Sequence, residues 1–96
     1  MEIKDLRNGM KRVEVEATIV EIGNPRQVMS RFKDETYTVA DATVQDETGT
    51  IKLTLWNEQI GQVKPGDKIK IENGYVTSFK GEVQLNVGKY GKMTVL

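Results

Sequence analysis

The sequence of 96 residues contains neither cysteine nor histidine. Without cysteine there is no disulfide framework and no thiolate-bound metal, and without histidine the commonest general base and transition-metal ligand are missing. Carboxylate chemistry, an oxygen-ligated magnesium or calcium site, and binding without chemistry remain. No nucleophile is paired with a base, and no acid lies in an apolar stretch that would raise its pKa. The sequence therefore predicts a binding protein that is not an enzyme and that needs no metal, no other cofactor and no small-molecule substrate.

Long hydrophobic runs are also missing. No apolar stretch approaches the roughly 20 residues that cross a bilayer, and Met1–Asp5 lacks the apolar core of a secretory signal. A hydrophobic content of 38% plus nine glycines is typical of a soluble domain, and 96 residues suffice for one core but not for two. We therefore expect a single cytoplasmic domain over residues 1–96 with no membrane partner.

An excess of charge of one sign is absent, because 14 Lys and Arg residues balance 14 Asp and Glu residues. A basic field over the whole molecule, which would indicate nucleic-acid binding, is thereby excluded. The charges are nevertheless unevenly distributed. Residues 24–33 carry three cations and no acid, whereas residues 34–50 carry five acids and no cation. This distribution predicts one basic and one acidic surface, although chance alone produces such unevenness in a short chain.

Apolar and polar residues alternate along most of the chain, which is typical of half-buried strands. In the first predicted strand the apolar parity changes between Ile19 and Val20, which indicates a β-bulge. Gly23-Asn24-Pro25 ends this strand, and the polar, basic segment 26–35 is predicted to form a protruding loop.

Four further strands are predicted, at 36–45, 50–56, 68–77 and 82–87, the fourth strand of the set of five being interrupted by a bulge at Asn73-Gly74. Residues 57–63 are predicted to form a short helix or turn, and residues 93–96 a short apolar end. Five strands with regularly spaced turns, and one connector between the third and fourth, predict an all-β, five-stranded Greek-key barrel, the OB-fold. An SH3-like barrel is the alternative architecture.

Trp56 breaks the pattern of its strand. It shares the outward parity of Lys52 and Thr54, whereas Leu53 and Leu55 face inward. An exposed tryptophan beside a lysine is suited to stacking on a nucleic-acid base. The alternative is that the barrel end or the following connector covers the ring.

Two further aromatic residues are predicted to share one side of a later strand. Tyr75 and Phe79 are four residues apart, which places both rings on one side of an extended strand. In an OB-fold the second and third strands, with the loops joining strands one to two and four to five, form the oligonucleotide groove. We therefore predict base stacking by the aromatic residues, phosphate contacts by the cations and further contacts by polar residues. The predicted site consists of Trp56, Tyr75, Phe79, Arg26, Arg31, Lys52, Lys80, Thr54, Thr77 and Gln84.

We predict structural roles for the remaining aromatic residues and for the acidic segment 46–49. Tyr37 is predicted to lie in the core, and Phe32 and Tyr90 to be loop anchors or rim contacts. Residues 46–49 read as a turn, because they lack the several spaced oxygen ligands of a calcium loop.

Three runs of the sequence carry a family resemblance: DETGTIKLTLW (46–56), KPGDKIKIENGY (64–75) and SFKGEVQLNVG (78–88). They resemble the simple archaeal single-stranded DNA-binding proteins, relatives of eukaryotic sensor-of-single-strand B subunits and of replication protein A OB domains. The resemblance implies an OB groove with stacking at the three aromatic residues of the predicted site and cationic contacts at Arg26, Lys52 and Lys80. It also implies a nucleoid-associated role in DNA replication, recombination or repair, with replication or repair proteins as partners.

Two features depart from that family. Its members often continue beyond the barrel into a flexible tail for partner proteins, whereas this sequence ends at Leu96, which is compatible with a truncated chain, a tail-less member or one OB module of a longer replication protein. Some relatives carry an aromatic residue where Asn86 stands, so one stacking position is expected to be missing.

The leading prediction is binding of single-stranded DNA without sequence specificity. Single-stranded RNA is an alternative ligand, because stacking platforms do not sense the sugar 2′-hydroxyl. A protein-interaction subunit of a replication protein A-like complex is a second alternative, because exposed aromatic residues rimmed by charge also suit a partner protein.

Overall fold

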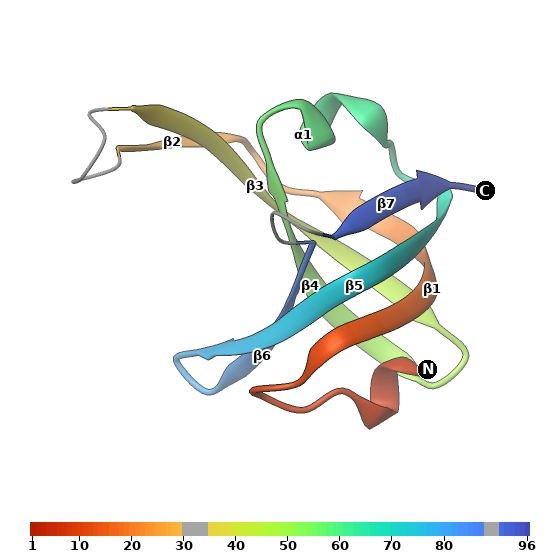
Figure 1. Cartoon of the computed structure of the whole chain (residues 1–96). Helices are drawn as coiled ribbons and strands as arrows, with labels where there is room; N and C mark the ends of the chain where they lie inside the picture. Colours follow the sequence, from red (N-terminus) through yellow and green to blue (C-terminus); the bar gives the residue numbers. More distant parts are fainter. Residues whose placement is uncertain (30–34, 88–90) are drawn as a thin grey trace.

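The computed structural model describes residues 1–29, 35–87 and 91–96, without the side chain of Phe79. Most of these residues are in strands (Figure 1). In chain order the elements are a 3₁₀ turn η1 (Ile3–Asp5), β1 (Lys11–Ile22), β2 (Arg26–Met29), β3 (Thr36–Asp46), β4 (Gly49–Trp56), α1 (Glu58–Gln62), β5 (Lys68–Phe79), β6 (Glu82–Asn86) and β7 (Lys92–Val95).

Five of the strands close into a barrel. Their hydrogen-bonded order is β1-β3-β4-β6-β5, and β5 returns to pair with β1. The pairing of β4 with β6 is parallel, and the other pairings around the barrel are antiparallel. This closed Greek-key arrangement is the OB-fold, which confirms the predicted all-β barrel over the SH3-like alternative. The predicted short helix is also confirmed, because α1 lies between β4 and β5.

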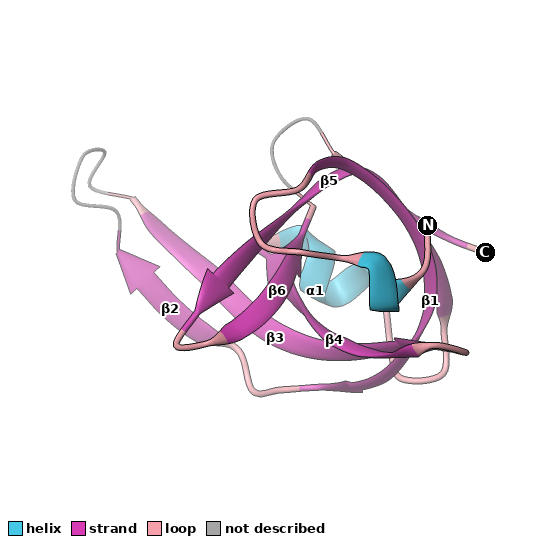
Figure 2. Ribbon diagram, turned by 90° about the horizontal axis from the view of Figure 1, so that it is seen from below, coloured by secondary structure: helices cyan, strands magenta, loops and turns pink. Residues whose placement is uncertain are grey.

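The barrel interior is filled by the inward-facing side of each strand. The predicted alternation in the first strand is confirmed, with Val13, Val15, Ala17 and Ile19 all buried. The two ends of the barrel are covered by α1 and by η1 (Figures 1 and 2), and buried Ile3 contributes to the core from η1. Among the described residues no helix is long and apolar enough to cross a membrane.

Both predicted bulges are present. The register of β1 with β3 shifts between Ile19 and Glu21, and the register of β1 with β5 shifts between Val13 and Val15 opposite the Asn73-Gly74 interruption. At the second bulge, a Cβ on Gly74 would lie 2.8 Å from the carbonyl oxygen of Asn86. Glycine is therefore favoured at this position, where a side chain would clash with the backbone of β6.

Residues 26–35 are predicted to form a loop, but the structure shows a strand over residues 26–29. Arg26–Met29 forms β2 and pairs with Thr36–Val39, so that β2 and β3 make a hairpin that projects from the barrel (Figures 1 and 2). All four β2 residues are exposed. Because this strand buries no core-facing side, its sequence lacks the alternation that identifies a half-buried strand.

The apolar C-terminal end is also a strand. β7 pairs antiparallel with Ile69–Glu72 of β5. The four residues of β7 are too few to show a reliable alternation, and their pairing partners lie 20 or more residues earlier in the sequence, so no local pattern identified the strand.

Candidate nucleic-acid interface

The outward-facing side chains of β3, β4, β6 and β5 form one continuous surface, which we call the groove face. Direct cross-strand pairs connect Asp41 to Thr54, Thr54 to Asn86, and Asn86 to Tyr75. Residues that lie directly opposite each other in a sheet project from the same side. Trp56 belongs to this face because it lies two residues beyond Thr54.

A parallel row of polar residues runs beside the first. It consists of Thr43 on β3, Lys52 on β4, Gln84 on β6 and Thr77 on β5, each paired with the next. The two rows are linked by a hydrogen bond from Asn86 Nδ2 to Thr77 Oγ1 at 3.1 Å. The structure thus brings together the predicted residues Thr54, Thr77, Gln84 and Lys52.

Trp56 is 40% exposed, as the parity of its strand predicts. Its ring meets that of Tyr37 edge-on, with centroids 5.9 Å apart and an interplanar angle of 79°. Its strand partner Val39 is 2% exposed yet lies outside the barrel core, on the groove face. One side of the indole is therefore supported by protein and part of it remains accessible, which is the geometry that a stacking platform needs.

The backbone around Trp56 is held by Asn57, which precedes α1, and by Gln59 of α1. The Trp56 amide donates to Gln59 Oε1 at 3.1 Å. Asn57 donates its amide to the Thr38 carbonyl at 2.7 Å and accepts from the Thr38 amide on Oδ1 at 3.0 Å. These bonds hold the end of β4 against β3, so the indole is presented from a rigid strand end rather than from a loop.

Tyr37 does not lie in the core, so that prediction is wrong. The ring is half-buried on the groove face against Trp56, and its hydroxyl donates to Glu35 Oε2 at 2.7 Å. This hydrogen bond, with a smaller contribution from desolvation, raises the pKa of Tyr37 above its usual value, which keeps the hydroxyl neutral. The parity of Ala40, Ala42 and Val44, all buried, would have placed Tyr37 outward.

Tyr75 is 37% exposed and stands on the groove face two strands away from Thr54. With strands about 4.8 Å apart and about 3.4 Å between residues along β4, the Cα atoms of Trp56 and Tyr75 are roughly 12 Å apart. Stacked neighbours in duplex DNA are about 3.4 Å apart, so two bases on these rings would not be consecutive members of a regular stack. Between the rings, Thr54 and Asn86 are each only 7% exposed, so an intervening nucleotide would meet mainly the neighbouring row of Lys52, Gln84 and Thr77.

The cations of the predicted site are held in different ways. Arg26 forms an ion pair with Asp41, with 3.2 Å between Nη1 and Oδ2. Lys52 Nζ donates to Thr43 Oγ1 at 3.0 Å, which keeps the ammonium on the groove face. Lys80 is exposed in the two-residue turn between β5 and β6, where it and Gly81 both have positive φ, as a tight hairpin with matched twist requires.

The structure does not describe the side chains of some of the residues named from the sequence. Arg31, Phe32 and Tyr90 lie outside the described residues. Phe79 ends β5 opposite Glu82, and its side chain is outside the described part of the structure. Sequence reasoning did not identify Asp41, Thr43 or Asn57 as residues that position the site. Their roles depend on cross-strand neighbours and not on any local pattern.

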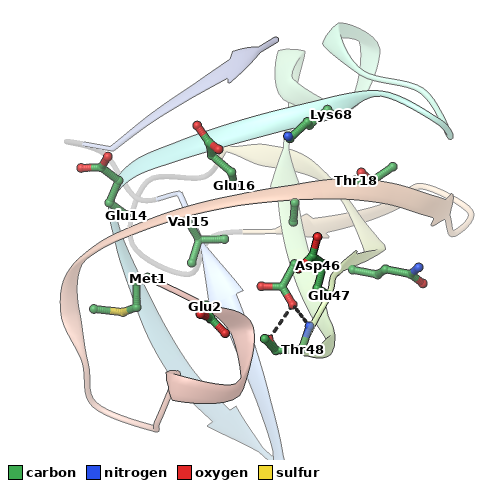
Figure 3. A pocket seen from close by; sticks show the side chains of 12 residues that line it. Met1, Glu2, Glu14, Val15, Glu16, Thr18, Asp46, Glu47, Thr48 and Lys68 are labelled. Atoms are coloured by element: carbon green, nitrogen blue, oxygen red, sulfur yellow. Dashed lines mark hydrogen bonds between the residues drawn. The ribbon is translucent and has the colours of Figure 1, made fainter.

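An acidic pocket lies at the far end of the β3–β4 hairpin from Trp56 (Figure 3). It has a volume of about 630 Å³, and its acidic lining residues are Glu2, Glu14, Glu16, Asp46 and Glu47. The Asp46 carboxylate accepts hydrogen bonds from the Thr48 amide and hydroxyl and the Gly49 amide on Oδ1, and from the Ile3 amide on Oδ2. Desolvation raises the pKa of Asp46, but these bonds outweigh it and lower the pKa below its usual value. The predicted turn at 46–49 is confirmed.

Comparison with known proteins agrees with this geometry. Residues 6–95 match the family described as single-stranded DNA binding protein Ssb-like, OB fold. The chain is 41% identical over 91 residues to the single-stranded DNA binding protein Ssb of Saccharolobus solfataricus, covering 95% of this chain and 60% of that protein. It is 29% identical over 89 residues to replication factor A of Methanothermobacter thermautotrophicus, covering 92% of this chain and 11% of that protein.

A solved structure shows the same fold. The OB domain of a Thermoplasma acidophilum protein superimposes with a TM-score of 0.85 at 23% sequence identity, covering 100% of this chain and 85% of that one. The chain spans less than two thirds of the length of both relatives named above. Because the family match extends over nearly all of the barrel, this chain belongs to the Ssb-like family of OB-fold single-stranded DNA-binding proteins.

Proposed function

We propose that this chain, as a single OB-fold domain over residues 1–96, binds single-stranded DNA without sequence specificity. The observation that carries the proposal is the Trp56 ring, partly exposed on a groove face that also holds Tyr75 and Lys52. Every base has a π-face, so aromatic platforms bind bases of any identity, and each stacked base contributes roughly 1–3 kcal/mol.

The proposed roles follow from the chemistry of each residue, and the structure describes the side chains of all of them except Arg31 and Phe79. Trp56, Tyr75 and Phe79 stack on bases, and Arg26, Arg31, Lys52 and Lys80 neutralise phosphates. Thr54, Thr77 and Gln84 supply hydrogen bonds to bases or sugars from the polar surface between the rings. Three or four phosphate contacts predict that the logarithm of affinity falls with the logarithm of salt concentration with a slope of about −2 to −3.

The broader role that we propose is protection of exposed DNA strands during replication, recombination or repair, in the cytoplasm at the nucleoid, together with replication or repair proteins. This role is supported by the names of the relatives, one an Ssb and the other a replication factor A. The charge asymmetry is compatible with it, because the acidic pocket lies at the opposite end of the β3–β4 hairpin from Trp56.

The test is a titration of Trp56 fluorescence with oligo-dT at low and high salt, since this is the single tryptophan of the chain. We expect quenching that weakens as salt is added. Duplex DNA is the control, because its bases are not available for stacking. The absence of quenching by any strand, together with an unchanged anisotropy of a labelled strand, would refute the proposal.

The same titration with single-stranded RNA of matched sequence distinguishes DNA from RNA, the first alternative ligand. Equal affinity for both strands would show that the groove does not read the sugar, and preference for RNA would point to contacts with the 2′-hydroxyl. A chain that binds neither strand would instead favour a protein-interaction role for the aromatic residues.

A further inference from the structure

A second cavity continues the groove face beyond Tyr75. It has a volume of about 490 Å³ and lies between β5 and the segment that leads into β1. Its lining includes Gly74, Tyr75 and Thr77 of β5, and Gly9 and Met10 of the segment before β1. The lining is mostly apolar, and the volume is within the range of about 300–1,000 Å³ that small-molecule sites occupy.

The cross-strand register makes this cavity part of the same surface. Thr54, Asn86 and Tyr75 are paired in sequence across β4, β6 and β5, and the next pair in the row is Tyr75 with Lys11 of β1. Lys11 therefore projects from the same side of the sheet as Tyr75 and ends the row. A strand that stacks on Tyr75 and continues in this direction meets the cavity next.

Arg12 adds a second cation through a local irregularity. It lies between the register positions Lys11 and Val13, where β1 slips against β5, and its φ is +55°. A non-glycine residue rarely adopts this conformation, and such outliers are concentrated at functional sites. The bulge redirects the Arg12 side chain relative to a regular strand, and Arg12 lines the cavity together with Lys11.

Both cations are available for a ligand. In residues 1–29, 35–87 and 91–96, neither the Lys11 ammonium nor the Arg12 guanidinium forms an ion pair or a side-chain hydrogen bond, and both residues are exposed. This contrasts with Arg26, which is paired with Asp41, and with Lys52, which is bonded to Thr43. Cations without a protein partner bind phosphate without first giving up another contact.

We infer that this cavity is an additional nucleotide subsite, in which a base lies beside Tyr75 and the adjoining phosphates contact Lys11 and Arg12. The inference rests on the proposed function, because the occupant is a continuation of the strand bound on the groove face. Continuity of the surface and charge complementarity both favour that occupant. The subsite lengthens the bound strand beyond what the ten residues of the predicted site would contact.

The test compares the wild-type chain with the double variant Lys11→Gln and Arg12→Gly. Glycine at position 12 accepts the positive φ, so the bulge is retained while the charge is lost. The matched control is Lys64→Gln and Lys68→Gln, which removes the same charge from two exposed lysines that line neither the cavity nor the groove face. Affinity is measured by Trp56 quenching with oligo-dT strands from about 3 to about 12 nucleotides at several salt concentrations.

Loss of two phosphate contacts should make the salt slope shallower by about 1.4 in the double variant. Between 50 mM and 200 mM salt, this difference corresponds to a change of roughly sevenfold in the ratio of the two affinities. The affinity of the wild-type chain should also keep increasing over longer strands than that of the double variant. The control should keep the wild-type slope and length dependence.

Three results would contradict the inference in different ways. If wild-type Trp56 is quenched but the double variant keeps the wild-type slope and length dependence, the subsite is wrong and the proposed function stands. If oligo-dT does not bind the wild-type chain at all, the proposed function fails and the subsite with it. A control that changes as much as the double variant would show a nonspecific effect of charge and would also overturn the subsite.

Discussion

Replacement of Trp56 by alanine tests the central contact of the groove face. Stacking of one base on an aromatic side chain is worth roughly 1–3 kcal/mol, so Trp56→Ala should weaken binding of oligo-dT by roughly 5- to 150-fold. The indole also has a structural role, because it meets Tyr37 edge-on at 5.9 Å and is only 40% exposed. The variant therefore changes both affinity and stability, and the two effects must be measured separately.

The stability cost follows from the contacts of the ring. An edge-to-face aromatic pair contributes about 0.5–1.5 kcal/mol, and loss of the buried part of the indole removes on the order of 100 Å² of apolar burial at about 25 cal/mol per Å². These contributions overlap, so we expect the free energy of unfolding to fall by about 2–3 kcal/mol. Small domains have unfolding free energies of about 5–15 kcal/mol, so the variant should remain folded at 25 °C.

The assay uses the fluorescence anisotropy of a labelled oligo-dT strand, because Trp56→Ala removes the only tryptophan. Urea denaturation followed by circular dichroism gives the unfolding free energy of the same samples. Trp56→Phe is the matched control, since it keeps an aromatic face beside Tyr37 and should recover most of the binding. A folded Trp56→Ala protein with wild-type affinity would refute the stacking argument, whereas an unfolded one would show that the indole is primarily structural.

Three further predictions concern other parts of the barrel. Asp41→Asn removes the ion partner of Arg26 and one negative charge from the groove face, so oligo-dT should bind up to about fivefold more tightly by anisotropy at low salt; weaker binding would mean that Asp41 is needed to orient Arg26. Gly74→Ala places a Cβ 2.8 Å from the Asn86 carbonyl oxygen and 3.1 Å from Ile71 Cγ2, and should lower the unfolding free energy in urea by about 1–3 kcal/mol; an unchanged value would show that β5 and β6 separate freely there. The pKa of Asp46 is lowered from 3.8 in the folded chain, so its stabilising contribution is present above pH 3.8 and is lost as the pH falls through the folded-state pKa. Asp46→Asn should therefore be less stable than wild type at pH 7 and less sensitive to acid in thermal melts between pH 2 and pH 7, and an equally acid-sensitive variant would exclude Asp46 as the cause.

The parts of the fold that have a periodic signal were predictable from the sequence. The alternation of Val13, Val15, Ala17 and Ile19 identified the first strand, and its change of parity identified a bulge, because burial on one side of a sheet imposes a period of two. The same reasoning placed Trp56 on the outward side of β4. It did not identify β2, because all of the residues of that strand are exposed and no burial pattern exists to be read.

The relationships between strands were not predictable in the same way. Tyr37 is adjacent to Trp56 because Val39 is paired with Trp56 across β3 and β4, and Asp41 reaches Arg26 because Val39 is also paired with Arg26 across β2 and β3. Such neighbours depend on register, and register is a property of the assembled sheet. The parity of a single strand predicts which of its residues face outward. It does not predict which partner each cation binds on a neighbouring strand.

The absence of net charge does not conflict with binding a polyanion, because the acidic pocket and Trp56 lie at opposite ends of β4. The β4 strand extends from Gly49, beside the acidic pocket, to Trp56 on the groove face. At about 3.4 Å per residue, its seven steps span roughly 24 Å. Screening in water acts over about 8 Å at physiological ionic strength, so the carboxylates of the pocket exert little repulsion on a strand bound near Trp56. In 10 mM salt the screening length rises to about 30 Å, and the same carboxylates then oppose association. At physiological salt we therefore expect the affinity of the proposed site to depend on contacts close to Trp56 and not on the net charge of the chain.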